Sequence, residues 1–308
     1  MDALAELLER VRQSDRRALA RLLSLAERDP LIIPALDEML PPDPGDTLVI
    51  GVTGPPGAGK STLVNALITP VLASHGRIAV LAVDPSSPFS GGAILGDRVR
   101  MSENTRDANV FIRSFASRGE QGGLAAPTAL ATRILAAAHW PVVLVETLGI
   151  GQVELAILDQ ADCVTVVLPP GWGDSIQANK AGLTESGDVF VINKSDRDGA
   201  DQSYRDLIDS LSLLQRAPPP QVFKTAALNN IGIDVLWSHL VRWNTAARDS
   251  GARQQRRQRQ RRSFLKQALY AHVRARMDHY IDRNDLSAGT TLNELLDRSL
   301  NGLTVDKR

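Results

Sequence analysis

A glycine-rich segment with one lysine and one serine is the first part of this chain that could do chemistry. Residues 54–61 read Gly-Pro-Pro-Gly-Ala-Gly-Lys-Ser and fit the pattern G-x-x-x-x-G-K-[ST] at every fixed position. In such a loop, backbone N–H groups curl around a phosphate, and the N-terminus of the following helix adds partial positive charge. Lys60 is expected to reach the β- and γ-phosphates of a nucleoside triphosphate, and the Ser61 hydroxyl to ligate Mg²⁺. The predicted nucleotide-binding residues of this loop are Gly54, Pro55, Gly57, Ala58, Gly59, Lys60, Ser61 and Thr62.

Carboxylates follow the phosphate loop at points where strands are expected to end. Asp84 comes directly after one apolar run and Glu146 ends another, while Asp97 lies in the long polar connection behind Asp84. A carboxylate at a strand end beside a phosphate loop suits Mg²⁺, directly or through a bound water. The sequence therefore predicts metal-linked roles for Asp84 and Glu146 and marks Asp97 as a functional candidate.

Two residues shortly after Glu146 are candidates for the hydrolysis step. Gly149 follows at the spacing at which the backbone N–H of a P-loop protein can reach the γ-phosphate. Gln152 could orient the attacking water. Glutamine is also an ordinary residue at the start of a helix, so the role of Gln152 stays open here.

A second motif, Asn193-Lys194-Ser195-Asp196, fits the N-K-x-D signature of guanine recognition. The Asp196 carboxylate can accept hydrogen bonds from N1–H and the exocyclic amine of guanine, which adenine does not offer in that arrangement. Asn193 is expected to fix the loop and the far edge of the base, and the stem of Lys194 to lie over the ring. A base without those donors leaves the carboxylate without hydrogen-bond partners, which gives strong discrimination against that base. Backbone N–H groups in the segment Thr225-Ala226-Ala227 are expected to meet guanine O6.

The motifs are separated by short apolar runs and helical stretches that alternate along the chain. This alternation predicts an α/β fold with a mostly parallel sheet covered by helices on both faces. In such sheets ligands bind at the carboxyl ends of the strands, which is where the candidate residues fall. The predicted strands are 47–52, 78–83, 109–113, 142–146, 163–168, 189–192 and 221–224.

Helical segments flank this predicted domain on both sides. Residues 1–40 have apolar residues at helical spacing, with breaks expected at Asp15 and Asp29. A proline- and glycine-rich stretch then leads into the first strand. We divide the chain into an N-terminal helical extension (1–46), a P-loop GTPase domain (47–247) and a C-terminal helical arm (248–308).

The helical arm opens with a basic run. Residues 253–262 hold six arginines interleaved with glutamines. Basic runs can bind phosphate backbones, but no aromatic residue interleaves here, so we interpret the run as the solvated start of a long amphipathic helix. Apolar residues continue at roughly helical spacing from Phe264 to Tyr280. A protruding helix with an apolar stripe usually docks on a partner, often a second copy of the chain.

The Pro/Gly-rich segment 169–180 allows two interpretations. It contains a tryptophan, an acid and a lysine, which is unusual for a simple connection. The segment is either a solvated crossover loop that leads into a helix or a segment that senses nucleotide or meets a partner. The residues alone do not separate the two.

Composition argues against several other classes of protein. The chain has 35 basic residues (lysine plus arginine) and 35 acidic residues (aspartate plus glutamate). Its net charge is therefore zero and does not favour binding to nucleic acid or to an anionic membrane. Cys163, the only cysteine, reads as a small core residue, and a cysteine zinc site is not expected. No run approaches the ~18 apolar residues of a membrane span, and the first residues lack the pattern of a signal peptide. We expect a soluble, cytoplasmic protein.

Four segments together resemble the MeaB/ArgK-type GTPases of the SIMIBI class of P-loop GTPases. They are GVTGPPGAGKSTLVNAL, VLAVDPSSPFSGGAILGDRVRM, VVLVETLGIGQVE and PGWGDSIQANKAGLTESGDVFVINKSD. The resemblance covers nearly the whole chain. It implies a GTP-dependent, Mg²⁺-using chaperone of an adenosylcobalamin-dependent acyl-CoA mutase, such as methylmalonyl-CoA mutase. Such a chaperone gates delivery or removal of the cobalamin and protects or reactivates the mutase.

The resemblance also implies roles for particular residues. Asp84, Asp97 and Glu146 would form a metal-linked switch set, and residues 170–180, including Lys180, an additional switch that couples hydrolysis to the bound mutase. The helical arm is similar to the homodimerisation element of the family. No D-x-H-x-x-G cobalamin-ligand pattern occurs, so any cobalamin is expected to be held by the partner.

Two other functions compete with this one. A nickel-insertion GTPase needs cysteine and histidine ligands at short spacing, whereas this chain has one cysteine in an apolar run and five scattered histidines. A kinase would pass phosphate to a protein or small molecule, but the N-K-x-D motif favours GTP hydrolysis with switch action.

Overall fold

The computed structural model describes residues 2–84, 107–116, 125–147, 160–171, 187–213 and 219–283. Within them, seven parallel strands form one sheet in the order β3-β2-β4-β1-β5-β6-β7. The α/β class is confirmed, and each strand begins within one residue of its predicted start. The strands are β1 (Leu48–Thr53), β2 (Ile78–Asp84), β3 (Val110–Ala116), β4 (Val142–Thr147), β5 (Cys163–Leu168), β6 (Val189–Asn193) and β7 (Gln221–Thr225).

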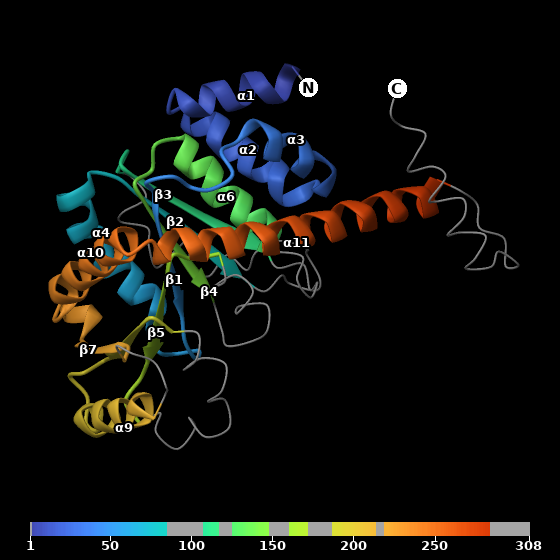
Figure 1. The fold of residues 1–308 in the computed structure, drawn as a ribbon. Coiled ribbons are helices and arrows are strands. Elements are labelled where there is room, and N and C mark those ends of the chain that lie inside the picture. Colours follow the sequence, from blue (N-terminus) through green and yellow to red (C-terminus); the bar gives the residue numbers. More distant parts are fainter. Residues whose placement is uncertain are drawn as a thin grey trace, which may run out of the picture.

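Helices cover both faces of the sheet and bury two apolar cores (Figure 1). Neighbouring residues of one strand point into opposite cores, as Val49 and Ile50 of β1 do, which explains why the strands are continuously apolar. On one face lie α4 (Lys60–His75) and α10 (Ile233–Asp249); α6 (Ala125–Ala137) packs on the other. The remaining elements are α1 (Asp2–Arg12), α2 (Arg16–Arg28), η1 (Pro30–Ile32), α3 (Ile33–Met39), α9 (Ala200–Ser212), η3 (Ala227–Asn229) and α11 (Ala252–Arg283).

The N-terminal helices share a core with the sheet. Leu7 of α1, Leu22 of α2 and Val143 of β4 belong to the same buried cluster. The two predicted breaks are helix caps: Asp15 accepts hydrogen bonds from the first turn of α2, and Asp29 from the first turn of η1. Helices α1, α2 and α3 are therefore packed against the α/β body.

The predicted solvated start of the arm is wrong. Arg253 and Arg257 on α11 are only 5% and 8% exposed. Arg257 donates from Nε and Nη2 to the two carboxylate oxygens of Asp162, each at 2.7 Å. Arg256 donates to Asp188 at 2.7 Å. These carboxylates lie at the starts of β5 and β6, so the arginine run attaches α11 to the domain.

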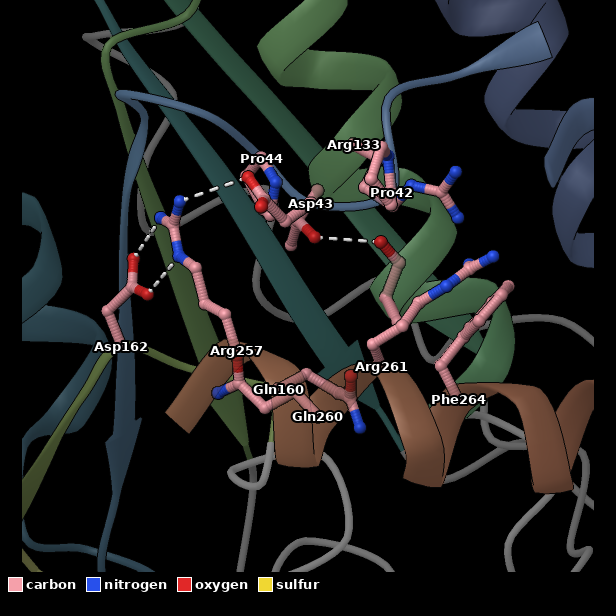
Figure 2. A pocket seen from close by; sticks show the side chains of 12 residues that line it. Pro42, Asp43, Pro44, Arg133, Gln160, Asp162, Arg257, Gln260, Arg261 and Phe264 are labelled. Atoms are coloured by element: carbon pink, nitrogen blue, oxygen red, sulfur yellow. Dashed lines mark hydrogen bonds and ion pairs between the residues drawn. The ribbon is translucent and has the colours of Figure 1, made fainter. Parts of the chain in front are cut away.

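A small pocket between α11 and the domain displays this attachment (Figure 2). Arg257 reaches from α11 toward Asp162 and Asp43. Asp37 of α3 accepts hydrogen bonds from both Arg133 and Arg261. We call the salt-bridged part of α11 between Arg253 and Phe264 the root of the arm.

Beyond Phe264, α11 extends away from the body of the domain (Figure 1). Leu265, Leu269 and Tyr270 are 46%, 62% and 76% exposed. Side chains of α11 therefore pack on the domain up to about Phe264 and are mostly exposed beyond it, while the domain boundary at residue 248 stays a prediction. None of the described helices is both long and apolar enough to cross a membrane.

Candidate nucleotide site

The candidate site begins where β1 ends at the carboxyl edge of the sheet. β1 lies between β4 and β5, and the chain turns at Gly54 into the phosphate loop and then into α4. Gly54 has a φ of 144°, and a Cβ there would lie 1.9 Å from the carbonyl oxygen of Val167 on β5. Only glycine lets the loop start against the backbone of the neighbouring strand.

The rest of the loop has the backbone that a phosphate cradle needs. Gly57 and Gly59 have φ values of 77° and 89°, in the left-handed region. Lys60, the first residue of α4, is 5% exposed, and its Nζ donates to the carbonyl oxygens of Gly54 (2.9 Å) and Pro55 (3.1 Å). The ammonium group thus lies across the loop. Phosphate oxygens would replace these carbonyl contacts when a nucleotide binds.

Ser61 and Glu146 meet across the site. The Ser61 hydroxyl, in the first turn of α4, donates to Glu146 Oε1 at 2.5 Å, and Glu146 is 1% exposed. Glu146 is paired in register with Ala82 of β2, so Asp84, at the end of β2, lies at the same edge of the sheet. Hydroxyl and carboxylate oxygens are the hard ligands that Mg²⁺ prefers, so the residues present fit a magnesium site.

Asn193, at the end of β6, joins the guanine motif to the phosphate loop. Its Nδ2 donates to the carbonyl oxygens of Ala58 (3.0 Å) and Gly59 (3.3 Å). Its Oδ1 accepts from the Thr225 hydroxyl (3.0 Å) and the Ala227 N–H (3.2 Å). An amide side chain offers two donors and two acceptor positions, and here the protein uses all four. The predicted role of Asn193 in fixing the loop matches these contacts, whereas none of its hydrogen bonds remains for the base.

Lys194 and Asp196 differ in their surroundings. Lys194 has a φ of 58°, and its Nζ donates to the carbonyl oxygen of Gly57 at 2.6 Å, so its stem runs beside the phosphate loop. Asp196 is exposed, and no hydrogen bond or ion pair of its side chain appears in the described part of the chain. Its carboxylate is thus open to a ligand.

Thr225, the last residue of β7, and Ala226, which follows it, are close to the site, but the Ala226 N–H is used differently from the prediction. Thr225 and Ala226 are buried. The Ala226 N–H donates to the carbonyl oxygen of Ile231 at 3.1 Å, in a tight reversal before α10. The expected contact of that N–H with guanine O6 would therefore require the loop to rearrange.

Several predicted residues lie outside the described part of the chain. They are Asp97, Gly149, Gln152 and Lys180. Thr62 is described and lies partly exposed beside Ser61 in the first turn of α4.

The sequence interpretation missed a threonine pair at the site. Thr53 and Thr147, the last residues of β1 and β4, are fully buried and hydrogen-bonded to each other at 3.1 Å. Their positions immediately before the phosphate loop and after Glu146 were the available signal.

Comparisons with known proteins identify the family of this chain. The model of the family described as methylmalonyl-CoA mutase-associated GTPase MeaB matches residues 19–280. A Pyrococcus abyssi protein named as a GTPase is 41% identical over 285 residues, covering 91% of this chain and 88% of its own. The GTPase ArgK of Escherichia coli is 38% identical over 280 residues, covering 88% and 85%. The crystal structure of a LAO/AO transport system kinase matches with a TM-score of 0.69 and 30% identity, covering 98% of both chains.

The range matched by the family model covers most of the chain and contains the phosphate loop, Glu146 and the guanine motif. The chain is a GTPase and belongs to the MeaB family of methylmalonyl-CoA mutase-associated GTPases.

Proposed function

We propose that this GTPase is a chaperone whose nucleotide cycle gates the loading, protection or reactivation of an adenosylcobalamin-dependent acyl-CoA mutase. The observation that carries the proposal is the contact set of Asn193, one buried amide that joins the guanine motif to the phosphate loop. We infer that this amide couples movement of the guanine-motif loop to the shape of the phosphate loop, as a switch requires. The family match supplies the kind of partner.

The proposed reaction is in-line attack of water on the γ-phosphate of GTP. Lys60 and the N–H groups of the loop would stabilise the charge that develops on the phosphate oxygens. Mg²⁺, when bound, would neutralise the β- and γ-phosphate oxygens, and its proposed protein ligands or water-mediated contacts are Ser61, Asp84, Asp97 and Glu146. Gln152 is the proposed water-positioning residue, Gly149 the γ-phosphate contact and Lys180 part of the segment that signals to the mutase.

Asp196 tests the guanine assignment. We expect Asp196→Asn to weaken GDP and GTP binding by about 10- to 100-fold, because the neutral amide loses charge-assisted bonds to the base. Binding of xanthosine nucleotides, which offer an acceptor at that edge, should improve. Asp198→Asn, in the same exposed loop, is the matched control and should bind GDP as the wild type does. Titration with fluorescent GDP and XDP measures both. Equal GDP affinity for Asp196→Asn and the control contradicts the assignment.

The mutase partnership is tested by turnover. We expect GTP hydrolysis to be slow alone and to rise when an adenosylcobalamin-dependent acyl-CoA mutase from the same organism is added. A pull-down with a non-hydrolysable GTP analogue, compared with GDP, should retain that mutase in a nucleotide-dependent way. Hydrolysis indifferent to every such mutase would remove the chaperone role and leave the GTPase.

We further propose that the arm beyond Phe264 forms a homodimer. Leu265 and Leu269 are exposed and four residues apart, which places them on the same side of α11. Leu269→Glu should turn the dimer into a monomer in sedimentation velocity, while Gln258→Glu, on an exposed position of the root, should not. A wild-type monomer at every concentration would contradict this.

A phosphotransferase is the second candidate, because the LAO/AO neighbour is named as a kinase. Labelled GTP separates the two. Label recovered only as inorganic phosphate agrees with the proposed function, and label on an acceptor protein or small molecule favours the kinase.

A further inference from the structure

Two buried threonines at the site have no role in the reaction proposed above. Thr53 is the last residue of β1 and directly precedes Gly54, and Thr147 is the last residue of β4 and directly follows Glu146. Both are 0% exposed. The Thr147 hydroxyl donates to the Thr53 hydroxyl at 3.1 Å. No solvent reaches this bond, so water cannot replace either partner without entering the core.

The bond extends the contact between the two strands to their very ends. The backbone register of β1 and β4 runs to the pair Val52 and Glu146, and the threonines follow on each strand. Successive side chains on a strand point to opposite faces. Glu146 therefore points toward α4, where it meets Ser61, and Thr147 points to the other face.

We propose that Thr53 and Thr147 are positioning residues that hold the ends of β1 and β4 at the spacing which brings Ser61 and Glu146 together. Ser61 is attached to the end of β1 through the phosphate loop, and Glu146 lies one residue before the end of β4. A change in the distance between the strand ends would thus separate a serine and a carboxylate that are now 2.5 Å apart. The inference rests on the proposed magnesium role of Ser61 and Glu146.

Magnesium-dependent nucleotide binding provides the test. The dissociation constant of fluorescent GDP is measured in EDTA and in excess Mg²⁺. The value in EDTA divided by the value in Mg²⁺ reports how well Ser61 and Glu146 are placed for the metal. Thr147→Val keeps the side-chain shape and removes the hydroxyl. We expect the ratio to fall by about 3- to 10-fold, the range of one buried hydrogen bond. Thr147→Ser keeps the hydroxyl and should retain the wild-type ratio.

A matched control separates positioning from general loss of packing. Thr128 on α6 is 0% exposed, and its hydroxyl has no hydrogen-bond partner in the described part of the chain. Thr128→Val should therefore leave the ratio unchanged. Melting temperatures of all variants report their folding. If Thr147→Val does not fold, Thr53→Val removes the same bond and must lower the ratio at least as much.

Three results would overturn the inference. The first is a ratio in Thr147→Val that is unchanged from the wild type, and the second is an equal fall of the ratio in Thr128→Val. The third is additive effects of Thr53→Val and Thr147→Val in the double variant, since the effects of removing the two partners of one bond must be non-additive. A ratio near one for the wild-type protein itself would have a different meaning. It would refute the magnesium role of Ser61 and Glu146 itself, and the positioning role with it.

Discussion

Arg257 at the root of the arm is expected to carry a large share of the stability of the domain. Its guanidinium makes two 2.7 Å hydrogen bonds to Asp162 and a third of 2.7 Å to the Thr47 carbonyl oxygen. Arg257→Met keeps the aliphatic stem and removes the charge. Asp162 would stay 2% exposed with only the more distant Arg253, 3.6 Å away, to balance it. Removing one partner of a buried pair typically costs about 3–5 kcal/mol, and we expect that loss here.

Urea unfolding followed by tryptophan fluorescence measures the free energy of unfolding of this variant. Arg259→Met is the matched control, because Arg259 lies two positions along the same helix, is exposed, and has no ion pair within the described residues. The control should stay within about 0.5 kcal/mol of the wild type. A loss below about 1 kcal/mol for Arg257→Met, the range of exposed ion pairs, would refute the reasoning.

Three further predictions concern pH, the phosphate loop and the cysteine. Burial tends to raise the pKa of Asp37, but hydrogen bonds from two arginines outweigh it and lower the pKa. The ionised carboxylate therefore stabilises the fold fully above about pH 4, and this stabilisation is lost as the pH falls below that value. Between about pH 6 and pH 3, the free energy of unfolding in urea should fall less steeply for Asp37→Asn than for the wild type. Gly54→Ala places a Cβ 1.9 Å from the Val167 carbonyl oxygen and should abolish GDP binding in a fluorescence titration. A Cβ at Gly57 would have no atom within 4 Å, so Gly57→Ala should lose only about 1 kcal/mol of stability. Equal losses of GDP binding in the two variants would contradict the close approach at Gly54. Burial raises the pKa of the Cys163 thiol well above its usual range, so the folded protein should resist a thiol reagent at pH 8 that labels it in urea, and rapid labelling of the folded chain would contradict this.

The strands were predictable because their signal is local. Runs such as Cys163–Leu168 are mostly apolar and buried on both faces of the sheet, and that pattern depends only on the layers above and below the sheet. The caps at Asp15 and Asp29 were predictable for the same reason, since each carboxylate bonds N–H groups within three residues of itself.

The arginine run was misinterpreted because its partners are distant in the sequence. Arg257 pairs with Asp162 at a separation of 95 residues, and Arg261 with Asp37 at 224. Nothing within the run distinguishes an arginine that meets a carboxylate from one that faces water. The spacing of four residues between Arg253, Arg257 and Arg261 indicates one side of a helix, but not what that side contacts.

The candidate site was predicted as a set of residue types, while their mutual contacts were not. The guanine motif indicated Asn193, but its four hydrogen bonds draw on two loops that come together only in the folded sheet. The threonine pair at the ends of β1 and β4 has no motif of its own, because one hydroxyl bond across neighbouring strands leaves no pattern in the order of residues.

The salt-bridged root of α11 determines where this chain can be shortened. A chain ended at residue 247, the boundary that the sequence alone indicated, would remove the arginines that pair with Asp162 and Asp188. A chain that continues through Phe264 keeps those counter-charges and omits the projecting apolar side. We therefore expect a version ended after Phe264 to be more stable than one ended at residue 247, because only the longer version keeps these ion pairs.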